Sequence, residues 1–144
     1  MINIEKMTIQ DLELIKDILE TDFDGFWTYS VFKSELENEN SRYIAAKIDN
    51  QIVGFAGIWK SVDDVHITNI VTKKDFRQKG IGKALLDKLI QISKQENINA
   101  VTLEVRHTNI PAINFYLKHG FKKVGLRKNY YKNQDDAILM TKNI

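Results

Sequence analysis

The sequence contains no cysteine, a single proline and no long apolar run. Without cysteine, disulfide bonds, thiolate catalysis and cysteine-based metal sites are excluded. The histidines His66, His107 and His119 do not pair with carboxylates at ligand spacing, so we expect no metal. No segment approaches the about 18 apolar residues that a membrane-spanning helix needs, and residues 1–10 lack the apolar region of a signal peptide. We therefore expect a cytoplasmic protein without a membrane partner.

The sequence also lacks a large excess of charge of either sign, because it has 21 basic and 19 acidic residues and a net charge of +2. Nucleic-acid binding normally needs a strongly cationic face, so this balance argues against a nucleic-acid partner. The 144 residues are 43% hydrophobic and 28% charged, which is typical of a soluble globular domain. No repeat or linker interrupts them, and we expect a single domain over residues 1–144.

Hydrophobic periodicity divides the chain into helices and strands. Helical spacing predicts helices, and a period of two predicts strands; Asp49-Asn50 is a typical hairpin turn and Gly120 a typical helix end. The expected helices span residues 8–23, 28–38, 81–95 and 109–120, and the expected strands span residues 2–6, 42–49, 51–60, 64–72, 100–106, 121–131 and 136–143. This order predicts an α/β fold in which a mixed sheet carries helices on both faces.

The expected strand over residues 64–72 contains one irregularity. Its apolar positions change phase between Ile67 and Ile70, as though one extra residue were inserted. We predict a β-bulge near Thr68-Asn69, because a bulge adds one residue to a strand and shifts the faces of those that follow.

The stretch RQKGIGKALL, residues 77–86, lies between a strand and a helix. Amides at a helix N-terminus lack partners within the helix and carry the positive end of its dipole, so they attract phosphate. Gly80 and Gly82 would let an anion approach the backbone closely. The spacing does not match the dinucleotide fingerprint or the P-loop. From these residues alone, an ordinary structural turn remains an alternative.

Three polar residues downstream are candidates for chemistry or for structure. Glu104 lies on the polar side of the strand AVTLEVR, where it could be a general base or pair with Arg106 or a lysine. Tyr116 could pack in the core or act as an acid, and Asn109 could cap the helix that follows. The residues themselves leave these alternatives open.

The motif R-x-x-G-x-G at Arg77, Gly80 and Gly82 resembles the coenzyme-A pyrophosphate loop of the GNAT acyltransferase superfamily. The stretches TNIVTKKDFRQKGIGKALLDKLI and LEVRHTNIPAINFYLKHGFKKVGLRKNYY extend the resemblance over residues 42–143, specifically to the RimI-type branch. This resemblance implies a GNAT-like, mostly antiparallel mixed sheet and acetyl-CoA as co-substrate. It also implies acetyl transfer to the N-terminal α-amine of a protein, usually a ribosomal protein with N-terminal alanine, by a monomer or weak dimer.

The resemblance also implies roles for individual residues. Glu104 corresponds to the catalytic base and Tyr116 to the acid that protonates the leaving thiolate. Tyr130 and Tyr131 correspond to residues that grip the acceptor peptide, with Trp27 and Tyr29 on the opposite wall. The implied coenzyme contacts are the backbone of Ile70, Val71 and Thr72, the loop residues Arg77, Gln78, Lys79, Gly80, Ile81, Gly82 and Lys83, and Asn109.

Small departures and rival functions accompany this hypothesis. Arg77 stands where glutamine is common, and no proline precedes Trp27. The strand over residues 64–72 ends in IVT, where smaller residues are more usual. The first departure leaves the coenzyme hypothesis intact, whereas the other two affect the peptide preference. The rivals are the same fold acting on a small-molecule amine, a non-catalytic domain that binds coenzyme A, and a nucleic-acid-binding domain.

Overall fold

The computed structural model describes residues 1–23, 27–132 and 134–144. The described chain forms a 7-stranded sheet in the order β1-β2-β3-β4-β5-β7-β6. Every neighbouring pair is antiparallel except β4 and β5, which are parallel. The strands are β1 (Asn3–Lys6), β2 (Ser41–Ile48), β3 (Gln51–Lys60), β4 (Asp64–Thr72), β5 (Ala100–Arg106), β6 (Lys122–Arg127) and β7 (Ala137–Asn143). The predicted mixed, mostly antiparallel sheet is confirmed.

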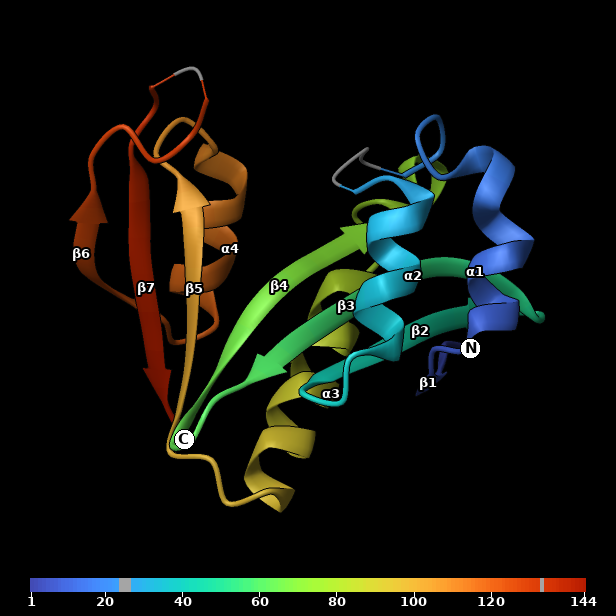
Figure 1. Ribbon diagram of the computed structural model, residues 1–144, viewed down its shortest axis with the longest axis horizontal. Coiled ribbons are helices and arrows are strands. Elements are labelled where there is room, and N and C mark those ends of the chain that lie inside the picture. The colour runs from blue at the N-terminus through green and yellow to red at the C-terminus, as the bar shows by residue number, and fades with distance from the viewer. Residues whose placement is uncertain (24–26, 133) are drawn as a thin grey trace.

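Helices cover both faces of this sheet, as predicted (Figure 1). Helices α1 (Ile9–Ile15) and α2 (Tyr29–Glu37) lie on one face, and α3 (Ile81–Gln95) and α4 (Ile110–Lys118) lie on the other. Each face has its own apolar core. Leu12 and Phe32 belong to the core under α1 and α2, whereas Leu85, Leu89 and Ile113 belong to the core under α3 and α4.

Two predicted elements are shorter in the structure. The expected helix over 8–23 starts as predicted, because Thr8 caps it and exchanges hydrogen bonds with Asp11 in a capping box. However, α1 ends at Ile15 and continues as a 3₁₀ turn over Lys16–Ile18. The expected strand over 121–131 ends at Arg127, because the chain turns where Asn129 adopts a left-handed φ of 53° and donates its backbone N–H to Asp136.

The β-bulge predicted in β4 is confirmed. Gly57 of β3 pairs with Asn69, and the next residue, Ile58, pairs with Ile67, so Thr68 is the inserted residue. The insertion changes which face the later residues use. Ile67 packs in the α3 core before the bulge, whereas Val71 packs in the α1–α2 core after it.

Tyr43 of β2 fixes this bulge from across β3. Its ring lies directly over Gly57, and its hydroxyl is 2.6 Å from the Thr68 hydroxyl. The ring also packs against Phe32 and Trp27, at centroid distances of 5.4 and 6.1 Å. Because the ring is buried, the pKa of Tyr43 is raised, and the hydroxyl stays protonated as a hydrogen-bond partner at neutral pH.

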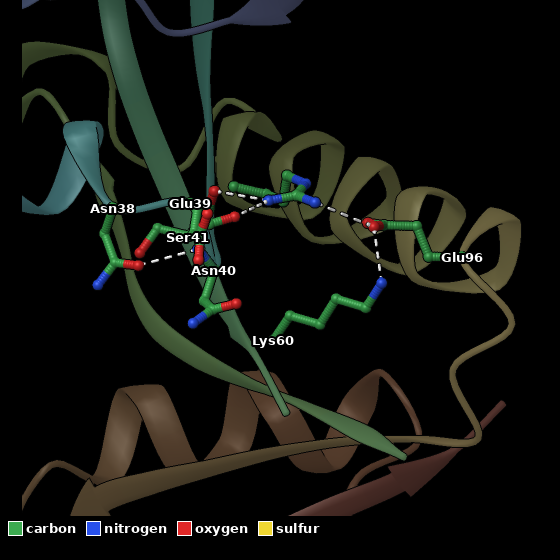
Figure 2. Close-up of polar contacts among 7 residues, drawn as sticks. Asn38, Glu39, Asn40, Ser41, Lys60 and Glu96 are labelled. Carbon is green, nitrogen blue, oxygen red and sulfur yellow. Dashed lines mark hydrogen bonds and ion pairs between the residues drawn. The ribbon is translucent and has the colours of Figure 1, made fainter. Parts of the chain in front are cut away.

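Strands β4 and β5 are joined at one end and separate toward the other. Their described parallel pairing covers Asp64–His66 and Ala100–Thr102, and the strands diverge beyond it (Figure 1). An ionic cluster ties α3 to the sheet near the joined end (Figure 2). Glu96 follows α3, and its Oε1 accepts hydrogen bonds from Arg42 Nη2 at 3.3 Å and from Lys60 Nζ at 3.1 Å.

The contact between Tyr43 and Gly57 predicts the outcome of adding one methyl group. A Cβ at position 57 would lie 2.2 Å from Tyr43 Cζ, and the ring is confined by the bulge and by its aromatic neighbours. We expect Gly57→Ala to lower the free energy of unfolding by about 1–3 kcal/mol, as overpacked cores do. Chemical denaturation measures it. Gly82→Ala is the matched control because its Cβ would lie 3.7 Å from Phe115, and equal stability of the two variants would contradict the prediction.

Candidate functional site

Two adjoining hollows open where β4 has separated from β5. The first has a volume of about 530 Å³ and lies between the end of β4, the start of α3 and the first turns of α4. The second has a volume of about 500 Å³ and shares Thr72, Arg77, Gln78, Gly82 and Phe115 with the first. Together they are lined by these expected coenzyme-binding residues: Ile70, Thr72, Arg77, Gln78, Gly80, Ile81, Gly82, Lys83 and Asn109.

Two of the expected coenzyme contacts do not line these hollows. The side chain of Val71 is buried in the α1–α2 core, so its coenzyme contact would come from its backbone, as the sequence-based hypothesis states. The amine of Lys79 lies 5.2 Å from the centroid of the Phe76 ring. Lys79 is the expected loop residue that the structure leaves outside the hollow walls.

The loop that precedes α3 presents its backbone to the second hollow. Gly80 caps α3 with a left-handed φ of 81° and no side-chain hydrogen bond, and an added Cβ there would meet no atom within 4 Å. Gln78 also has a positive φ, of 62°. The amides of the first turn of α3 therefore lack a side-chain acceptor, and the dipole adds positive potential. This arrangement suits an anion such as a phosphate group.

Tyr116 of α4 and Asn109, which caps α4, line the first hollow. The Tyr116 ring packs edge-on against Phe115 and Phe121, and burial raises the pKa of its hydroxyl to about 12. Tyr116 therefore keeps its proton at neutral pH. Asn109 caps α4 by accepting the backbone N–H of Ala112 at 3.3 Å, as predicted, and lines the same hollow.

Glu104 lies on the other face of β5. The predicted alternation is confirmed, because Leu103 and Val105 are buried in the α3 core while Glu104 points away from it. The Glu104 side chain is 14% exposed, and its Oε1 lies 3.3 Å from Arg127 Nε. A hydrogen bond from the Tyr130 hydroxyl reaches the same carboxylate and raises the pKa of Tyr130. Sequence reasoning left open a pair of Glu104 with Arg106 or a lysine as the alternative to a base, whereas the structure pairs Glu104 with Arg127.

The loop between β6 and β7 is attached to the same face of β5 by Arg106. Its Nη1 lies 2.9 Å from Asp135 Oδ2, and its guanidinium lies 4.2 Å from the centroid of the Tyr131 ring. Tyr131 and Tyr130 pack edge to face, with ring centroids 5.1 Å apart. The structure thus brings the expected tyrosine pair beside Glu104.

The other two expected acceptor-binding aromatics lie in the α1–α2 layer. Trp27 packs against Phe32 at a centroid distance of 5.9 Å. The Tyr29 hydroxyl bonds to Glu13, and the amine of Lys16 lies 4.4 Å from its ring centroid. These contacts belong to the packing of α1 against α2, and acceptor binding by either residue stays a prediction.

Asn69 lies at the change of phase that sequence reasoning found in β4. It follows the inserted Thr68, and its side-chain Oδ1 is buried without a hydrogen-bond partner in the described chain. A buried amide oxygen without a partner is costly, and such groups concentrate where a ligand or water completes the structure.

The described residues contain no group of three or more histidine, aspartate or glutamate residues that could hold a metal ion. No described helix is both long enough and apolar enough to span a bilayer.

The buried Tyr116 hydroxyl predicts a loss of stability at high pH. An unfolded tyrosine releases its proton near pH 10, whereas Tyr116 in the folded chain keeps it to about pH 12. The folded state thus binds more protons in this interval, so its stability falls as the pH rises through it. We expect the wild type to lose up to about 2–3 kcal/mol more than Tyr116→Phe above pH 10.

Urea denaturation of both proteins between pH 9 and pH 11.5 measures this difference. The other tyrosines, including Tyr43, are present in both proteins and cancel in the comparison. Equal losses in the two proteins would show that Tyr116 does not hold its proton through burial.

Comparison with known proteins places this geometry in a family. Residues 12–121 match the model of the acetyltransferase (GNAT) family. A [ribosomal protein bS18]-alanine N-acetyltransferase of Haemophilus influenzae is 35% identical over 120 residues, covering 79% of this chain and 80% of its own. The crystal structure of the ribosomal-protein-S18-alanine N-acetyltransferase from Escherichia coli superposes with a TM-score of 0.89 at 28% identity, covering 100% of this chain and 94% of its own.

A solved structure from Bacillus anthracis in complex with acetyl coenzyme A is 28% identical. It has a TM-score of 0.71 and covers 78% of this chain and 68% of its own. The sequence-based resemblance, its fold and its co-substrate are therefore confirmed. The chain belongs to the acetyltransferase (GNAT) family and is an acetyl-CoA-dependent N-acetyltransferase.

Proposed function

We propose that this enzyme acetylates the N-terminal α-amine of a protein, with a ribosomal protein that begins with alanine as its substrate. The names of the relatives from Haemophilus influenzae and Escherichia coli support this choice of acceptor. The observation that carries it is the position of Glu104, which lies on β5 in contact with Tyr130 and beside Tyr131. A carboxylate in this position can receive an amine, and the two aromatic side chains beside it can pack against the peptide that follows the amine.

Acetyl-CoA supplies the thioester whose acetyl group is transferred. In our proposal its diphosphate contacts the amides of Gln78–Lys83, and its pantetheine arm lies along the backbone of Ile70–Thr72. The hollows formed by these segments and by Asn109 support this placement. The backbone amides of β4 that no longer face β5 are available as donors for that arm.

Glu104 acts as the base in this proposal. A peptide α-amine has a pKa of about 8, so most of it carries a proton at neutral pH and cannot attack a carbonyl carbon. The Glu104 carboxylate receives that proton directly or through one water. The hydrogen bond from Tyr130 and the Arg127 guanidinium hold the carboxylate in place.

Tyr116 acts at the leaving sulfur. Its hydroxyl keeps its proton, since burial raises its pKa to about 12. A thiol has a pKa of about 8.5, so full proton transfer from Tyr116 to the negatively charged sulfur is uphill and becomes complete only as solvent returns a proton to Tyr116. The hydroxyl therefore contributes first as a hydrogen-bond donor to that charge and then as its proton source.

Gly82→Ala tests the placement of the coenzyme. A Cβ at position 82 meets only ordinary contact with Phe115 at 3.7 Å, so the fold tolerates it, and alanine favours a helix more than glycine. The same methyl group reduces the space inside the two hollows, because Gly82 lines both of them. We expect an unchanged or higher melting temperature together with at least about tenfold weaker acetyl-CoA binding by calorimetry. Unchanged affinity would place the coenzyme elsewhere.

Glu104→Gln and Tyr116→Phe test the catalytic roles. We expect each variant to lower kcat on an alanine-terminated peptide by about 100-fold or more, as loss of general acid or base does. Turnover is measured by release of free thiol with a panel of N-terminal peptides, lysine-only peptides and polyamines. Glu96→Gln is the matched control, since Glu96 follows α3 and contacts Arg42 and Lys60. Full turnover by both variants on every accepted amine would refute these roles.

A further inference from the structure

The proposed base is already paired with a cation before an acceptor arrives. The Glu104 side chain is 14% exposed, whereas that of Arg127, at the end of β6, is 57% exposed. The exposed Arg127 side chain thus places its guanidinium against the less exposed carboxylate. The guanidinium also lies 5.7 Å from the centroid of the Tyr130 ring. An acceptor amine that reaches Glu104 must therefore approach this guanidinium.

Asp135, beside the same tyrosine pair, also has a cationic partner. Asp135 pairs with Arg106 at 2.9 Å, and His107 Nε2 lies 3.7 Å from its other oxygen. Asp136 caps the loop through the backbone N–H of Asn129. Glu104 and Asp135 each have an arginine partner, so a cation that binds at either carboxylate has to compete with a guanidinium.

We propose that Arg127 is a specificity-determining residue that makes this enzyme select weakly basic α-amines over strongly basic amines such as lysine side chains and polyamines. The inference rests on the proposed function, because it assumes that the acceptor amine binds at Glu104. Arg127 acts through its positive charge, which repels any amine that arrives protonated.

Acid–base equilibria explain the selection. At pH 7 about one in ten α-amines is neutral, whereas only about one in 2,500 lysine amines is, from pKa values of about 8 and 10.4. The neutral fraction of the α-amine approaches Arg127 without repulsion, and the guanidinium opposes only the protonated fraction, whose proton Glu104 must take. A lysine or polyamine amine arrives almost always as a cation, and each approach is opposed by the guanidinium at a site that is only partly screened by water.

The test compares two acceptors within each variant. One is an alanine-terminated peptide without lysine, and the other is the same peptide with a blocked N-terminus and one internal lysine. In Arg127→Gln we expect the ratio of kcat/KM for the α-amine to kcat/KM for the lysine amine to fall by about tenfold, the effect of one unit charge near a partly exposed site. Arg127→Lys keeps the charge and should preserve the ratio within about twofold.

Lys128→Gln is the matched control, because it removes an exposed cation from the adjacent position. It should also leave the ratio within about twofold, since charge farther from the amine is screened. Because each ratio is taken within a single variant, a smaller fraction of folded enzyme cancels from it. An unchanged ratio in Arg127→Gln, or an equal fall in Lys128→Gln, would overturn the inference.

A binding measurement covers the case in which Arg127→Gln turns over too slowly. Calorimetric titration with 1,5-diaminopentane should show about tenfold tighter binding to Arg127→Gln than to the wild type. Equal affinity would overturn the inference. Failure of the proposed function has a different signature, namely a wild-type enzyme that does not acetylate any N-terminal peptide.

Discussion

The inserted residue Thr68 in β4 is the constraint on which the rest of the site depends. Tyr43 reaches over Gly57 and holds the Thr68 hydroxyl at 2.6 Å, so the irregularity is fixed by a buried ring rather than left to the strand itself. A bulge increases local twist and bends its strand. Beyond it, β4 leaves β5, and the hollows beside α3 and α4 open along the separated edge. A site for an extended ligand is thus built from an interruption in sheet pairing.

Strand β5 joins the two halves of this site through its alternation. Val101, Leu103 and Val105 anchor it in the core shared with α3 and α4, where Tyr116 packs. Glu104 and Arg106 emerge on the opposite face, where the hairpin of β6 and β7 is attached. In our proposal the strand therefore sets the coenzyme side and the acceptor side relative to each other, and the apolar core that holds the strand also fixes the positions of the proposed catalytic residues.

The sequence predicted the elements because these depend on local patterns, whereas the roles of the candidate site residues followed from the family resemblance and stay predictions. The period of the apolar residues located the strands and the bulge. Gly80, which caps α3, and Gly82, in its first turn, marked the segment that lines the hollows. The contacts of Glu104 with Arg127 and of Arg106 with Asp135 could not be predicted, since they join residues 23 and 29 positions apart. Their pairing depends on where the chain turns after β6, and that turn begins four residues earlier than the end expected from the pattern, at Arg127 rather than residue 131.

The bulge is also accompanied by a cost in folding free energy at the residue next to it. Asn69 follows Thr68, and its buried Oδ1 has no hydrogen-bond partner in the described chain. Such a group costs about 1–3 kcal/mol, a substantial fraction of the stability of a small domain. Natural proteins break such rules mainly at functional sites, so the unpaired Oδ1 and the separation of β4 from β5 both support the ligand site that we propose beside them.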